Sequence, residues 1–160
     1  MSQPTLRFML SHPAHVLALG FGAGLAPAAP GTVGTLVAFP LYFFVAYALP
    51  PSGVLAIVAL LFATGVWACG RTGAALGVAD HGGLVWDEIV AFMLVLVFTP
   101  PGLLWQALAF GAFRFFDIAK PPPIGTIDRD WKGGLGVMTD DIVAAFYSVI
   151  VIAVLKRLVA

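Results

Sequence analysis

Charged side chains are scarce in this chain. Only 10% of its 160 residues are Asp, Glu, Lys or Arg, whereas 61% are hydrophobic, and the formal net charge is zero. Soluble domains are about 25% charged, so a water-soluble globule of this size would lack the polar surface to cover itself. A chain without net positive charge also lacks the electrostatic footprint of a nucleic-acid-binding protein. The composition therefore indicates an integral membrane protein.

Cysteine is nearly absent as well. Cys69 is the single cysteine, so no internal disulfide can form and nothing suggests an oxidising compartment. The chain also lacks a set of Cys and His residues that could bind zinc. Its length fits one domain, which we assign to residues 1–160.

Long stretches of the sequence carry no charge at all. No charged residue occurs between Arg7 and Arg71, and further gaps run over 89–113 and 142–155. A helix needs about 20 largely apolar residues to cross the hydrocarbon, so we expect an all-α, polytopic membrane bundle. The five expected membrane helices are 33–49, 54–69, 88–98, 103–119 and 140–155.

The segment before these helices allows two interpretations. Arg7, an apolar stretch and Ala26-Pro27-Ala28 resemble a cleavable signal peptide. His12, Pro13 and His15, however, interrupt the apolar stretch. We therefore favour an N-terminal interfacial or partly inserted helix, followed by a loop rich in Gly and Pro.

The positive charges predict the orientation. With five spans, one side of the membrane receives Arg7, Arg71, Lys120, Arg129 and Lys132, and the other receives Lys156 and Arg157. Because cytoplasmic loops carry the excess of Lys and Arg, the first side is expected to be cytoplasmic. All eight acidic residues lie on that side or just inside it.

One pattern occurs twice along the chain. Gly82-Gly83 precedes the acidic pair Asp87-Glu88, Gly133-Gly134 precedes Asp140-Asp141, and Ile-Val-Ala follows each pair. Capping of free helix N–H groups explains one such pair well, with Thr139 or Asp140 as a suitable cap. Two neighbouring pairs would repel each other unless a cation lay between them. Oxygen ligands alone suit Mg²⁺ or Ca²⁺.

Two further polar elements accompany these pairs. Arg114, Asp117 and Lys120 are three residues apart and share one helix face, either as an ion pair between the first two or with Asp117 on the cation and the bases on an anion. The glycine-rich segment 20–35 is the second element. Its N–H groups and hydroxyls could bind phosphate at a helix start, whereas the spacing of Gly20 and Gly24 favours close helix packing.

Four motifs together resemble the phosphatidylglycerophosphatase A family. They are GAGLAPAAPGTVGT (22–35), VWDE (85–88), RFFDIAKP (114–121) and GGLGVMTDD (133–141). They follow the family order over most of the chain. Ala119 stands where a bulkier residue, often Trp, is familiar. The resemblance implies an all-helical, Mg²⁺-dependent enzyme of the bacterial inner membrane that hydrolyses phosphatidylglycerophosphate to phosphatidylglycerol and phosphate at the cytoplasmic face.

This interpretation assigns roles to named residues. One or two Mg²⁺ ions are expected on Asp87, Glu88, Asp117, Asp140 and Asp141. Phosphate binding is expected from Gly31, Thr32, Thr35, Arg114, Lys120 and Lys132. His81, beside Asp80, is a candidate proton shuttle. The phosphorus is attacked either by a water oriented at the metal or by one of the carboxylates, which would form an aspartyl-phosphate.

Two other functional classes compete with a lipid phosphatase. A small membrane transporter with an acidic cation-binding site would use the same residues along an ion path. The acidic pairs, however, enter their helices from the same side, which does not indicate an inverted repeat. A non-catalytic assembly factor would need the acids only as helix caps. The expected partners are the lipid substrate and membrane lipids.

Overall fold

The computed structural model describes residues 4–159, and within that range the chain is helical with no strand. The prediction of an all-α protein is therefore confirmed. The helices are α1 (Leu6–Leu10), α2 (Pro13–Ala18), the 3₁₀ helix η1 (Gly20–Leu25), α3 (Pro30–Ala48), α4 (Pro51–Leu76), α5 (Trp86–Phe98), α6 (Leu103–Ala119), α7 (Ile124–Asp130) and α8 (Gly134–Val159).

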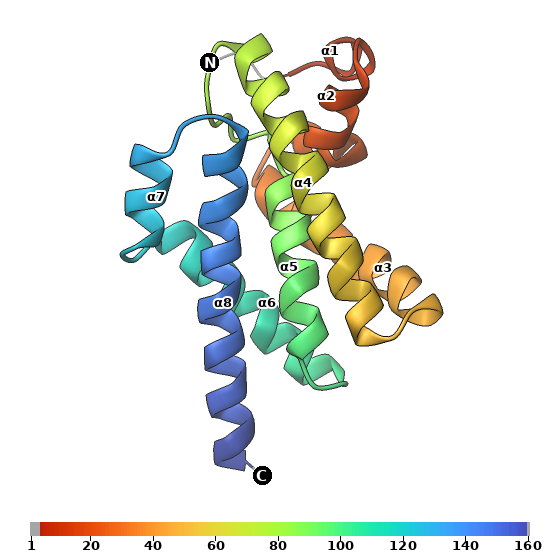
Figure 1. Ribbon diagram of the computed structural model, residues 1–160, viewed down its shortest axis with the longest axis vertical. Helices are drawn as coiled ribbons and strands as arrows, with labels where there is room; N and C mark the ends of the chain where they lie inside the picture. Colours follow the sequence, from red (N-terminus) through yellow and green to blue (C-terminus); the bar gives the residue numbers. More distant parts are fainter. Residues whose placement is uncertain (1–3, 160) are drawn as a thin grey trace.

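Helix α5 is the centre of the bundle (Figure 1). It packs against α3, α4, α6 and α8, and nearly every residue from Trp86 to Leu96 is buried. A helix that is hydrophobic on all sides is stable only when it is surrounded, so the uniform apolar sequence of α5 explains its central place.

Three helices are long and apolar enough to cross a membrane, namely α3, α4 and α8. Large apolar side chains lie exposed on the outside of the bundle, among them Phe44, Tyr47 and Leu103. Such a surface is stable in lipid, so the chain is membrane-associated. Helix α5 has 13 residues, about 20 Å at 1.5 Å per residue, which is shorter than the hydrocarbon core of about 30 Å. The prediction of five spans is thus supported for three helices.

The N-terminal segment differs from the single helix that the sequence suggests. It forms α1, α2 and η1, because the chain turns at Ser11 and His12, and the His12 side chain accepts a hydrogen bond from the N–H of Ala14 at 3.0 Å. The carbonyl of Ala18 then accepts a hydrogen bond from the N–H of Val85 at 3.0 Å. These contacts attach the segment to the loop that leads into α5.

Alternating helix directions bring several helix ends together. The starts of α5 and α8 lie toward the same end of the bundle as the ends of α4 and α6, the upper end in Figure 1. The predicted turns lie at the other end: Pro50-Pro51 joins α3 to α4, and Thr99-Pro100-Pro101-Gly102 joins α5 to α6. In the second turn, Gly102 has a φ of 116°. Glycine adopts such a φ without steric cost.

Candidate metal and phosphate site

The two acidic helix segments meet in space. One oxygen from each of Asp87, Glu88 and Asp141 lies within 4.8 Å of the others. Asp87 and Glu88 lie in the first turn of α5, and Asp141 lies about two turns inside α8. Asp87 is 7% exposed and Asp141 is 3% exposed. Three carboxylates thus share a nearly dry site, where their mutual repulsion requires a counter-charge.

Helix capping does not explain the acidic pair of α8. That helix begins at Gly134, so Thr139, Asp140 and Asp141 lie beyond the first turn and its free N–H groups. The capping interpretation of this pair is therefore wrong. In α5, one acidic oxygen does satisfy a free N–H group of the first turn: Asp87 Oδ1 accepts a hydrogen bond from the N–H of Glu88 at 3.0 Å.

The early start of α8 has a packing cause. A Cβ atom on Gly134 would lie 1.9 Å from the carbonyl oxygen of Val66 and 2.6 Å from the nitrogen of Gly70. Only glycine allows α8 to approach α4 this closely. Gly134 thus sets the close contact of α8 with α4, and Gly83 of the first copy packs near the carbonyl oxygen of Gly24, 3.0 Å from its Cβ position.

Arg114 connects three helices at the site. Its Nη1 forms an ion pair with Asp117 Oδ2, lies 3.6 Å from Glu88 Oε1 and donates to Thr35 Oγ1 at 3.4 Å. The expected ion pair with Asp117 is therefore present. Asp117 lies near Asp141 but outside the three-carboxylate group. Its described contact orients the guanidinium.

Lys120 occupies a second position between carboxylates. Its Nζ lies 2.6 Å from Asp128 Oδ1 and 2.7 Å from Asp140 Oδ2. Burial disfavours the charged amine, but the hydrogen bonds with Asp128 and Asp140 outweigh it and raise the pKa of Lys120. Asp140, a predicted metal ligand, is thus held by an ammonium group beside the three-carboxylate group.

Sequence reasoning missed the role of Asp128. This residue lies in α7, and three prolines separate that helix from Lys120. No spacing rule relates two side chains across such a turn. The sequence showed only that Asp128 follows Lys120 of the RFFDIAKP motif by a few residues, and an acid this near a lysine is common on any protein surface.

The start of α3 forms one wall of the site. A Cβ atom on Gly31 would lie 2.1 Å from Glu88 Oε1, and the Thr35 hydroxyl donates to the Gly31 carbonyl at 2.8 Å. Gly31 and Thr35 are therefore beside the acids, whereas Thr32 is half-buried without a described side-chain hydrogen bond. Gly24 serves packing instead, because a Cβ there would lie 2.0 Å from the carbonyl oxygen of Gly83.

Four buried atoms at the site lack a hydrogen-bond partner among the described residues. They are Glu88 Oε2, Asp140 Oδ1, Asp141 Oδ2 and Arg114 Nε. Each such atom costs about 1–3 kcal/mol, so their concentration at one place indicates a binding site. Three are anionic acceptors that a cation would satisfy. The fourth is a cationic donor suited to a phosphate oxygen.

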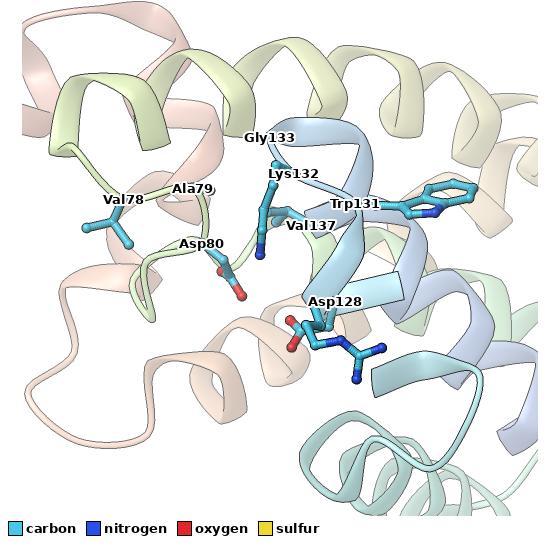
Figure 2. A pocket seen from close by; sticks show the side chains of 9 residues that line it. Val78, Ala79, Asp80, Asp128, Trp131, Lys132, Gly133 and Val137 are labelled. Carbon is cyan, nitrogen blue, oxygen red and sulfur yellow. The ribbon is translucent and has the colours of Figure 1, made fainter. Parts of the chain in front are cut away.

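A cleft of about 440 Å³ is lined in part by Asp128, the partner of Lys120. Figure 2 shows Lys132 and Asp80 projecting into it from opposite sides, with Asp128 below them. Lys132 is exposed in this cleft. His81 belongs to the same loop as Asp80, and its Nδ1 accepts a hydrogen bond from the N–H of Gly83 at 3.1 Å. The described contacts of His81 thus lie within its own loop.

The arrangement combines features needed at a phosphomonoester. An oxygen-only, buried carboxylate group suits a hard divalent cation. A guanidinium fixed by Asp117 and Thr35 presents donors to an anion next to that cation. Together they can neutralise the charge of a phosphoryl group.

Comparison with known proteins agrees with this chemistry. The family model "Phosphatidylglycerophosphatase A" matches residues 16–156. A Haemophilus influenzae protein of that name is 44% identical over 153 residues, covering 94% of this chain and 93% of the relative. The Escherichia coli protein of that name is 42% identical over 143 residues, covering 89% and 83% respectively.

A third relative carries another name. A Bacteroides thetaiotaomicron protein described as a "Putative phosphatidylinositol-3-phosphatase" is 36% identical over 148 residues, covering 88% of this chain and 92% of the relative. None of the solved structures matches the chain. All three relatives are named as phosphatases, and the transporter alternative gains no support from them.

Proposed function

Because the chain belongs to the phosphatidylglycerophosphatase A family, we propose that the site formed by α3, α5, α6 and α8 hydrolyses the terminal phosphomonoester of phosphatidylglycerophosphate. The products are phosphatidylglycerol and inorganic phosphate, and the enzyme is a phosphoric monoester hydrolase. The observation that carries the proposal is the buried group of Asp87, Glu88 and Asp141 beside Arg114.

The proposed cofactor is Mg²⁺, held by Asp87, Glu88 and Asp141. The unpartnered oxygens of Glu88 and Asp141 support this choice, because both are buried acceptors without a donor among the described residues. When bound, a divalent cation polarises phosphoryl oxygens and lowers the pKa of a coordinated water. Asp117 and Asp140 then lie beside the cation, Asp117 in an ion pair with Arg114 and Asp140 in an ion pair with Lys120, which Asp128 shares.

Arg114 is proposed to bind the phosphoryl group. Asp117 and Thr35 hold its Nη1, and the buried Nε has no partner among the described residues. A phosphate oxygen at Nε would satisfy that donor. The first turn of α3 approaches Glu88 closely at Gly31 and offers the hydroxyl of Thr32 to the same anion. The hydroxyl of Thr35 donates to the Gly31 carbonyl and accepts from Arg114, so Thr35 serves the anion site by holding Arg114. Lys120 partly offsets the charge of Asp128 and Asp140, between which it lies, and Lys132 attracts the headgroup into the cleft.

The proposed location is the bacterial inner membrane, with five spans and the site at the cytoplasmic face. The excess of Lys and Arg in the loops at the site end supports this orientation. Placement at that face allows the acyl chains of the substrate to stay in the bilayer while its headgroup enters the cleft. Helices α5 and α6 would complete the five spans in a bilayer thinned locally around them.

Phosphate release by the purified protein from short-chain phosphatidylglycerophosphate, with Mg²⁺ or with EDTA, tests the proposal. Asp87→Asn and Asp141→Asn are each expected to abolish turnover and leave the fold intact. Asp130→Asn is the matched control, because the Asp130 side chain is 51% exposed and forms an ion pair with Arg129. Full activity of Asp87→Asn or Asp141→Asn, or full activity in EDTA, would contradict the metal site.

The same protein can distinguish the two forms of attack. Acid quenching during turnover of substrate labelled in its terminal phosphate leaves label on the protein if a carboxylate attacks phosphorus. It leaves none if water attacks directly. A parallel assay with phosphatidylinositol 3-phosphate measures headgroup selectivity, and we expect phosphatidylglycerophosphate to be the better substrate.

A further inference from the structure

A furrow of about 450 Å³ runs along the outside of the bundle between α3 and α6. Leu36, Phe39 and Phe43 form its α3 wall, and Leu103, Ala107 and Phe110 form its α6 wall. Gln106 is the polar residue in this lining. The furrow is therefore apolar over most of its length and open to the side, where lipid surrounds the protein.

Its floor is built from α5. The ring of Phe92 lies 5.1 Å from the ring of Phe39 and 5.9 Å from the ring of Phe110, measured between centroids. The rings of Phe39 and Phe110 are stacked at 6.3 Å. These three rings close the space behind the furrow, because α3 and α6 both pack on α5. The two outer helices are held apart and leave an opening along the surface.

The furrow is in register with the proposed phosphate site. On α3, Thr35, Phe39 and Phe43 are successive turns of one face. On α6, the corresponding succession is Arg114, Phe110 and Gln106. The two series begin at a contact, since Arg114 Nη1 lies 3.4 Å from Thr35 Oγ1. One turn further from the site, Phe39 and Phe110 meet, and beyond them the furrow continues toward Leu103.

We propose that this furrow binds one acyl chain of the lipid substrate and so sets the position of the headgroup relative to Arg114. The proposal rests on the proposed function, because it requires a lipid phosphomonoester at the carboxylate site. The α6 wall of the furrow runs from Phe110 to Leu103, about 10 Å along a helix, which is less than half of a hydrocarbon core of about 30 Å. The furrow can therefore hold part of an acyl chain of one leaflet, with the glycerol and phosphate groups of the headgroup between that chain and Arg114.

The expected effect is on positioning. The surrounding lipid is as apolar as the furrow, so the furrow gives little net attraction for a hydrocarbon chain. A chain held beside α6 nevertheless restricts where its headgroup can lie, and restricted geometry raises the rate of the reaction at a fixed catalytic group. Long-chain substrates should depend on the furrow, and chains too short to fill it should not.

The test places a larger side chain in the furrow, first on its α6 wall and then on its α3 wall. Ala107 is exposed on α6 and lines the furrow, which a six-carbon chain is too short to fill. Ala107→Phe is expected to lower kcat/KM about tenfold for dioleoyl phosphatidylglycerophosphate in mixed micelles, chiefly through kcat. Its kcat/KM for the dihexanoyl substrate should stay unchanged. Leu36→Trp, on the opposite wall, should act in the same way if Ala107→Phe fails to fold.

Ala153→Phe is the control, because Ala153 is an exposed alanine of α8, away from the furrow. It should leave both substrates unaffected. An equal loss on both chain lengths in the furrow variants, or no loss on either, would overturn the furrow proposal while wild-type activity upholds the phosphatase. Wild-type protein inactive toward both substrates would overturn the proposed function and the furrow with it.

Discussion

The backbone of Gly31 lies against the carboxylate of Glu88, so closely that a Cβ atom at residue 31 would lie 2.1 Å from Glu88 Oε1. The same Cβ would lie 3.1 Å and 3.2 Å from the two terminal nitrogens of Arg114. The first turn of α3 therefore fixes how far these two side chains extend. Any side chain at position 31 must displace one of them.

Gly31→Ala is expected to lower kcat/KM by about 10²-fold, the effect of misplacing reacting groups by roughly 1 Å. Thermal stability should hold or rise, since alanine stabilises a helix relative to glycine. Phosphate release and thermal unfolding in detergent check both statements. Gly82→Ala is the control, because a Cβ there meets nothing within 4 Å. Wild-type activity in Gly31→Ala would contradict the assigned contact.

Lys120 and Asp140 should be energetically coupled. Lys120→Met leaves the Asp140 carboxylate, 4% exposed, without its cation, and we expect a loss of about 1–3 kcal/mol in the free energy of unfolding. Adding Asp140→Asn should recover part of that loss, with a coupling of about 0.5–3 kcal/mol for residues in contact. Chemical denaturation in detergent of the wild type, the two single variants and the double variant completes this double-mutant cycle. Additive losses would show that the contact contributes nothing.

The pH dependence of stability should include a contribution from His15. Burial, followed by the charges of His12 and Arg71, lowers the pKa of His15, and its Nδ1 lies 2.9 Å from Thr72 Oγ1. The unfolded chain binds a proton near pH 6.5, whereas the folded chain resists protonation until lower pH. Stability is therefore full above about pH 6.5 and falls as the pH decreases below it.

His15→Gln removes this titration and keeps an amide that can bond to Thr72. The thermal midpoint of wild-type protein should fall more steeply than that of the variant between about pH 7 and pH 5. Parallel slopes for the two proteins would exclude a contribution from His15. His12→Gln serves as a comparison, because it removes a neighbouring imidazole while the buried ring of His15 remains.

Much of the fold could be predicted from the distribution of charge. The helix expected at 103–119 agrees with α6, and the helix expected at 88–98 begins two residues earlier, at Trp86, and ends as expected. Pro30 and Pro51 begin α3 and α4 earlier than the apolar runs suggest. Helix α8 begins at Gly134, well before its acidic pair. The sequence does not reveal this start, because it depends on the close packing of Gly134 against α4.

The sequence predicted which residues form the site, but only part of how its acids pair with its bases. Repetition of the acidic pattern indicated that Asp87, Glu88 and Asp141 would meet, and the structure brings them together. Sequence spacing could not separate these three from Asp117 and Asp140, which ion pairs with Arg114 and Lys120 hold beside them. The pair of Arg114 and Asp117 follows the i, i+3 spacing within α6. The contacts of Lys120 with Asp128 and Asp140 depend on the turn after α6 and on α7, where three prolines interrupt any regular spacing.

The carboxylate group also has a consequence for biosynthesis. Its members come from α5 and from α8, which follows α5 later in the chain and supplies Asp141. A nascent chain that has inserted α5 but not α8 therefore carries Asp87 and Glu88 without their third carboxylate. The complete group forms only when α8 has been synthesised and has packed against α5.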